Sequence, residues 1–98
     1  MADPTDPLVA TLRAEIDGAD HAIVEALSRR IDAVRRLHDH KVARGYPLSD
    51  PGREAAIVGR LVGGGEGPIS AEGIAELVAA VLAITRREVA GLRGQSWG

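Results

Sequence analysis

The chain has 98 residues, no cysteine, a net charge of −2 and a pI near 5.9. This length corresponds to one small domain, and the lack of cysteine excludes disulfides, thiolate metal sites and a cysteine nucleophile. The weak charge excludes the broad basic field of a general nucleic-acid-binding protein. Hydrophobic residues make up 45% of the chain, but with one Trp, one Tyr and no Phe they favour an all-α fold over a β-rich one.

The N-terminal segment does not have the residue pattern expected of an export signal. MADPTDPLVA is acidic and lacks the basic-then-apolar order of a signal peptide. The apolar runs of the chain are also too short to span a bilayer. We therefore expect a cytoplasmic protein, with residues 1–7 as a disordered lead-in to a helical domain over residues 8–92.

A long amphipathic helix is predicted from about Pro7 to about Ala43, ended by a left-handed cap at Gly45 and by Pro47. Its apolar stripe recurs at helical spacing: Leu12, Ile16, Ala19, Ile23, Leu27, Val34 and Leu37. A helix of about 36 residues is about 54 Å long, which two short helices of one chain cannot cover. The sequence therefore favours a symmetric dimer in which the long helices pack together.

Two cations lie on this apolar stripe. Arg30 and Lys41 are eleven positions apart, so they point in the same direction about 16 Å apart along the axis. A buried cation is costly unless an anion meets it, and Asp32 and Asp39 of the same helix point elsewhere. Either acids from another helix pair with these cations, or a small dianion binds them.

Two shorter helices follow. The middle helix is predicted over about Pro51–Val62, with Asp50 as its N-cap and Pro51 at its first position. The glycine-rich linker 63–68 lacks the Lys-Ser/Thr of a phosphate loop. The third helix is predicted over about 71–92, capped by Ser70, with 93–98 as a loose tail.

Further charged residues could contribute to a site. Arg53 and Glu54 lean toward the buried side of the middle helix, and Arg53 opposes the helix dipole there, which suggests another reason for its presence. Arg13 lies seventeen positions before Arg30 and about a quarter-turn off its stripe. Arg13 is therefore either a surface residue or a contributor to a pocket on an antiparallel partner.

The histidines and serines give no further site. His38 and His40 diverge on a helix, so with His21 they do not form a metal set. Neither Ser28 nor Ser49 has a histidine at a spacing that would activate it as a nucleophile.

The ordered set of motifs resembles the all-helical, type II chorismate mutase family from about Leu8 to Val89. The motifs are Leu12-Arg13-Ala-Glu-Ile16-Asp17, Ala19-Asp20, Leu27-Ser28-Arg29-Arg30, Lys41 and Ser49-Asp50-Pro-Gly-Arg53-Glu54. The resemblance implies a three-helix subunit and an intertwined homodimer with two sites built from both chains. The implied reaction is the Claisen rearrangement of chorismate to prephenate, in phenylalanine and tyrosine or specialised aromatic biosynthesis, without a cofactor or metal.

The resemblance also implies roles by position. Arg30, and Arg13 of the other chain, would clamp the substrate's carboxylates as bidentate donors. Lys41 would donate to the ether oxygen and to a carboxylate. Glu54, helped by the Asp50 backbone, would hold the ring hydroxyl, and Arg53 would support the carboxylate network.

Helix 71–92 holds one match to the family and one departure from it. Thr85 matches a small hydroxyl residue near the ring carboxylate. Four positions after this hydroxyl residue, the family usually has Gln or another polar residue, which acts as a second donor to the ether oxygen. This chain has Val89 at that position. Losing such a donor can cost on the order of 10²–10³ in rate. We therefore expect a slow mutase, a mutase helped by a partner protein, or a relative with a changed substrate.

Two alternatives stay open. On the same scaffold, an isochorismate pyruvate lyase or a 4-amino-4-deoxychorismate mutase would use the same clamp; residues 29–34 resemble the lyase branch, whereas Asp50, Arg53 and Glu54 favour a hydroxyl-bearing ring. A non-catalytic helical dimerisation or regulatory module would instead pair Arg30 and Lys41 with Glu54. Because some short family members are activated by the enzyme that begins the shikimate pathway, such a partner is conceivable here.

Overall fold

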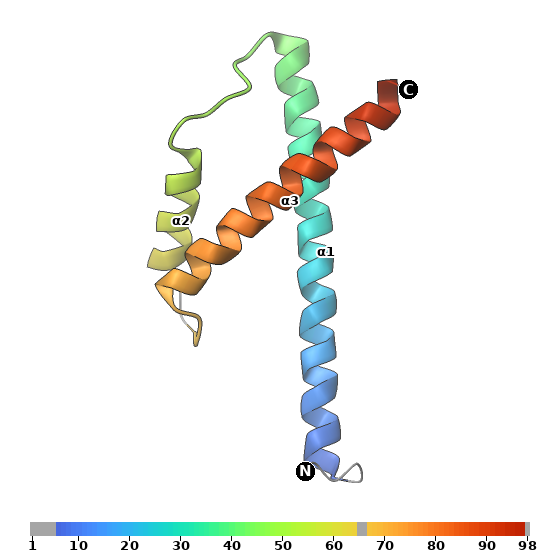
Figure 1. Cartoon of the computed structure of the whole chain (residues 1–98), viewed down its shortest axis with the longest axis vertical. Coiled ribbons are helices and arrows are strands. Elements are labelled where there is room, and N and C mark those ends of the chain that lie inside the picture. Colours follow the sequence, from blue (N-terminus) through green and yellow to red (C-terminus); the bar gives the residue numbers. More distant parts are fainter. Residues whose placement is uncertain (1–5, 65–66, 98) are drawn as a thin grey trace.

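Three helices joined by two loops form the structure (Figure 1). The computed structural model describes residues 6–64 and 67–97, and within these ranges it contains α1 (Pro7–Arg44), α2 (Arg53–Gly63), α3 (Ala71–Trp97) and no strand. The predicted all-α class and the long first helix are therefore confirmed. None of the described helices is both long and apolar enough to cross a membrane.

The start of α1 is set by Asp6 and Pro7. The Asp6 carboxylate accepts hydrogen bonds from the backbone N–H groups of Leu8, at 2.9 Å, and Val9, at 3.4 Å. These are backbone donors that have no partner inside the helix, so an N-cap carboxylate stabilises it. Pro7 occupies the first helical position, where its missing N–H costs nothing. Of the predicted lead-in, residues 1–5 lie outside the described residues.

The end of α1 is set by Gly45, as predicted. Gly45 is left-handed, with φ 69° and ψ 24°. Its N–H donates to the Val42 carbonyl, and the N–H of Tyr46 donates to the Lys41 carbonyl. This pair of bonds is the Schellman motif, which satisfies two carbonyls that the helix leaves unpaired.

The predicted start of α2 is wrong by two residues. Asp50 does not cap the helix through its side chain, because α2 begins at Arg53 with Gly52 as its N-cap. Gly52 has φ 87° and ψ −8°, and the Arg53 N–H donates to the Asp50 carbonyl at 3.1 Å. These angles are those of the third residue of a type II turn, which favours proline at the position that Pro51 holds and glycine after it. The Pro-Gly pair therefore makes a turn, and a left-handed Gly52 keeps both residues out of the helix.

The predicted cap of α3 is confirmed, whereas its predicted end is not. The Ser70 hydroxyl accepts a hydrogen bond from the Gly73 N–H at 3.0 Å, as an N-cap should. The helix then continues to Trp97, where the sequence predicted a loose tail after Leu92. Gly94, the one glycine between Leu92 and Trp97, lowers helix propensity by about 1 kcal/mol, which is too little to stop a helix already under way.

α3 is the helix on which the other two are arranged, since it contacts both α1 and α2 (Figure 1). The core lies where α2 meets α3 and consists of Ile57, Ile74 and Val78, with Val58 and Leu82 packed against it. Residues four apart on one helix share a face, so Ile74, Val78 and Leu82 form one ridge. That ridge holds α2 in place.

α1 buries none of its residues within this chain. Its N-terminal half extends away from the other helices (Figure 1) and exposes large apolar residues: Leu8, Leu12, Ile16, Ile23 and Val24. The radius of gyration is 18.1 Å, against about 13 Å for a compact domain of this length. The chain therefore has an apolar surface that its own helices leave uncovered.

Opposite stability changes are expected from alanine at two glycines. Gly45→Ala should lower the free energy of unfolding by about 1–2 kcal/mol, because a residue with a Cβ is disfavoured in the left-handed conformation. Gly59→Ala, inside α2, should raise it by about 0.5–1 kcal/mol, since alanine is the better helix former. Neither new Cβ would meet an atom within 4 Å, so backbone conformation alone separates the two. Chemical denaturation measures both, and a destabilised Gly59→Ala variant would contradict this account.

Candidate functional site

Arg30 of α1 and Thr85 of α3 are joined by a hydrogen bond where the two helices cross. Arg30 Nη1 donates to Thr85 Oγ1 at 2.7 Å, and the same hydroxyl donates to the Val81 carbonyl at 2.7 Å. Thr85 is only 3% exposed, and Arg30 is half-buried. Threonine readily bonds the carbonyl one turn back in a helix, and this bond fixes its hydroxyl facing α1.

The positive charge of Arg30 has no acidic partner within the described residues, where no ion pair includes Arg30, Lys41 or Glu54. Burial, and then the nearby charge of Arg53, lower the pKa of Arg30 below its ordinary value. An arginine nevertheless stays protonated in proteins. The like charge of Arg53 thus acts on Arg30 while no carboxylate is paired with Arg30 among the described residues, and this favours the binding of an anion.

An apolar hollow of about 380 Å³ lies beside Arg30, between α1 and α3. Arg30 is its one charged lining residue, and the other lining residues are Ile23, Ala26, Leu27, Leu77, Ala80, Val81 and Ile84. An apolar hollow with a single convergent charge has the general character of a small-molecule site. The hollow is open on one side, so this chain alone does not enclose a ligand.

Lys41 lies in a separate, smaller hollow on the same side of α1. This hollow measures about 90 Å³ and is lined by Val34, Leu37, His38 and Leu48 as well as Lys41. Lys41 is half-buried, and Leu48 comes from the loop that connects α1 to α2. The two predicted cations therefore both sit against apolar surface, as expected from their positions on the stripe.

Arg53, Glu54 and Asp50 are all exposed in this chain, so the expectation that Arg53 and Glu54 lean toward the buried side of the middle helix is wrong for the single chain. The two helix residues stand in the first turn of α2, which packs on α3. Arg53 is linked to the site through its charge, which acts on Arg30. Glu54 is not brought into any recorded bond within the described residues, and Asp50 contributes its carbonyl to the turn that precedes α2.

Arg13 lies far from Arg30 within one chain, whereas Val89 lies one turn from Thr85. Arg13 is exposed on α1, about 26 Å along the helix from Arg30, so one chain does not bring the two together. Val89 is 5% exposed and follows Thr85 by one turn on the same face of α3. Within one chain, Arg30 is thus joined to Thr85, and Val89 lies on the same face of α3 as Thr85, whereas Arg13 lies far from all three.

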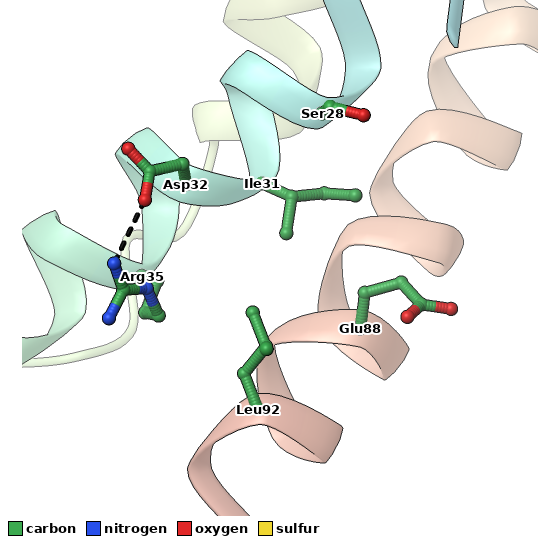
Figure 2. Close-up of a pocket in the computed structure, with 6 residues that line it drawn as sticks. All are labelled: Ser28, Ile31, Asp32, Arg35, Glu88 and Leu92. Atoms are coloured by element: carbon green, nitrogen blue, oxygen red, sulfur yellow. Dashed lines mark hydrogen bonds and ion pairs between the residues drawn. The ribbon is translucent and has the colours of Figure 1, made fainter. Parts of the chain in front are cut away.

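A third hollow, of about 350 Å³, lies elsewhere along the α1–α3 contact, and the sequence did not predict it (Figure 2). It is lined by Ser28, Ile31, Asp32, Arg35, Glu88 and Leu92. Asp32 accepts a hydrogen bond from Arg35 at 2.9 Å and forms an ion pair with Arg36 at 3.0 Å. The hydrogen bond from Arg35 is the largest cause that lowers the pKa of Asp32. Figure 2 shows the Glu88 carboxylate pointing away from this pair. The charges on the α1 side already compensate one another, unlike that of Arg30.

Comparison with known proteins shows which family the sequence matches. Residues 12–89 match the family described as chorismate mutase type II. A 4-amino-4-deoxychorismate mutase from Streptomyces pristinaespiralis is 39% identical over 56 residues, which are 57% of this chain and 43% of that protein. Another from Streptomyces venezuelae is 37% identical over 49 residues, 50% of this chain and 48% of that protein. The chain thus spans a little under half the length of these curated relatives. No solved structure matches the chain significantly.

Proposed function

Because the chain belongs to the chorismate mutase type II family, a family of isomerases, we propose that it rearranges chorismate to prephenate. The observation that carries this proposal is the guanidinium of Arg30. It is half-buried, feels the charge of Arg53, and has no carboxylate partner among the described residues. A substrate with two carboxylates would supply the missing negative charge.

The reaction suits a site made of cations rather than of acids and bases. A Claisen rearrangement within one molecule needs the enolpyruvyl arm held over the ring, and it needs stabilisation of the partial charge on the breaking ether oxygen. Arg30 would hold a carboxylate, and Lys41 would donate to the ether oxygen. Glu54 would hold the ring hydroxyl with help from the Asp50 backbone, and Arg53 would support the carboxylate network.

The same proposal includes a homodimer. The uncovered apolar residues of α1, the elongated shape and the open hollow beside Arg30 all support a second chain at this surface. An antiparallel α1 from a partner would cover the hollow and carry its own Arg13 toward Arg30. Each site would then contain Arg30 of one chain and Arg13 of the partner subunit.

A second substrate, 4-amino-4-deoxychorismate, is favoured by the names of both curated relatives. It keeps the two carboxylates, so Arg30 and Arg13 would act on it in the same way. The difference lies at the ring substituent, where a carboxylate such as Glu54 can accept a hydrogen bond from either a hydroxyl or an ammonium group. A cytoplasmic location and an activating partner enzyme of the shikimate pathway are further parts of the proposal.

Turnover should depend on Arg30. Incubation with chorismate, isochorismate and 4-amino-4-deoxychorismate, followed by identification of the products, should give prephenate from chorismate or its amino analogue from the amino substrate. Arg30→Ala should abolish this turnover while helicity is retained, because only a charge on the stripe is lost; Arg29→Ala, at the exposed neighbouring position, is the matched control. Wild-type rates in Arg30→Ala, or pyruvate release from isochorismate alone, would overturn the assignment.

Mixing two inactive variants should restore activity if each site uses both chains. In a mixed dimer of one Arg13→Ala chain and one Arg30→Ala chain, both substitutions fall in the same site. The other site keeps both arginines, so each mixed dimer has one intact site and one doubly damaged site. Random mixing makes about half of the dimers mixed, so activity should return to about a quarter of the wild-type value. Co-refolded variants are assayed against each variant refolded alone. A mixture as inactive as its components would mean that Arg13 does not act across the dimer.

Val89→Gln should raise kcat. Val89 is buried one turn beyond Thr85 on the same face of α3, so a Gln amide there would supply the second donor to the ether oxygen that the family usually has at this position. A preorganised donor of this kind is worth on the order of 10²–10³ in rate when it is correctly aimed. Val89→Leu is the control that keeps the position apolar. An unchanged or lower kcat for Val89→Gln, measured with the preferred substrate, would show that this position does not face the ether oxygen.

A further inference from the structure

We propose that Thr85 is a positioning residue that orients Arg30, and that it does not itself bind the substrate. This inference rests on the proposed function, and it departs from the substrate contact that the family resemblance implies for Thr85. It follows from the two hydrogen bonds of one hydroxyl group and from its burial.

The hydroxyl proton of Thr85 is already committed. Thr85 Oγ1 lies 2.7 Å from the Val81 carbonyl oxygen and 2.7 Å from Arg30 Nη1. A carbonyl can only accept a hydrogen bond, and a guanidinium can only donate one. The single proton of the hydroxyl must therefore point at Val81, and a lone pair must face Arg30. No proton remains for a substrate carboxylate.

The surroundings of Thr85 also keep it from the substrate. Its side chain is 3% exposed, and Val89, one turn further on the same face, is 5% exposed. Arg30 already occupies the lone pair that faces α1. A substrate carboxylate could bind this hydroxyl only by taking its proton from the Val81 carbonyl, while the charge-assisted bond from Arg30, among the stronger kinds in proteins, continues to hold the hydroxyl in place.

The contact leaves the useful edge of Arg30 available. Thr85 binds Nη1, and no bond is recorded at Nε or Nη2 among the described residues. Nε and Nη2 carry parallel N–H groups on one edge of the guanidinium, and this edge can hold a carboxylate through two hydrogen bonds. By holding Nη1, Thr85 fixes the rotation of the guanidinium before substrate arrives, which lowers the cost of ordering it on binding.

The first test uses the free protein and needs no turnover. In the wild type, the bond to Thr85 should slow rotation of the Arg30 guanidinium, so its Nη groups should give separate ¹⁵N side-chain signals. Thr85→Val should merge these signals and Thr85→Ser should restore them, with the exposed Arg29 as the internal reference and circular dichroism as the check on folding. Merged signals in the wild type, or separate signals that persist in Thr85→Val, would overturn the inference.

The second test is a double-mutant cycle on turnover. Thr85→Val should lower kcat/KM on the order of 10- to 100-fold through a misplaced clamp, and Thr85→Ser should recover most of it. In an Arg30→Lys background, which removes the planar fork, Thr85→Val should have little further effect, because both changes remove the same function. Additive effects would mean that Thr85 contacts the substrate directly. A wild-type protein inactive on all three substrates would refute the proposed function, while the spectroscopic test would still decide the role of Thr85.

Discussion

The crossing of α1 and α3 is built around a positive charge that the described residues do not neutralise. Arg30 is held by the hydroxyl of Thr85, and that hydroxyl is held in turn by the Val81 carbonyl. Burial and the charge of Arg53 both act against the charged form of Arg30, so the arrangement costs stability in the free protein. Such a cost is characteristic of a site that waits for an anion, because the ligand supplies the compensating charge.

The contrast with the neighbouring charges of α1 supports this view. Asp32, two positions after Arg30 and on another side of α1, binds both Arg35 and Arg36 at the surface, and exposed pairs of this kind contribute little to stability. The same helix thus carries a compensated cluster on one side and an uncompensated cation on the other. Arg30 differs from the Asp32 cluster because it lies against α3, and not because more charges surround it.

Spacing rules predicted the features that depend on a single helix. The stripe that places Arg30 and Lys41, the cap at Gly45 and the cap at Ser70 are all local, and the structure agrees with each. The predicted helix start at Asp50 is wrong because an Asp-Pro pair can begin either a helix or a turn. The left-handed conformation of the following Gly52 makes it a turn here. The Arg30–Thr85 bond joins residues 55 positions apart, so no local pattern could predict its geometry. The roles of Arg13, Lys41 and Glu54 stay predictions for the same reason.

A helix of 38 residues that buries none of them in its own chain has a consequence for how the protein folds. If a second copy covers α1, then no fully folded single chain precedes assembly, and folding and association become one event. The population of folded molecules would then follow the total protein concentration, falling on dilution even without denaturant. The cell could in that case set the amount of working protein as much through expression level as through any bound regulator.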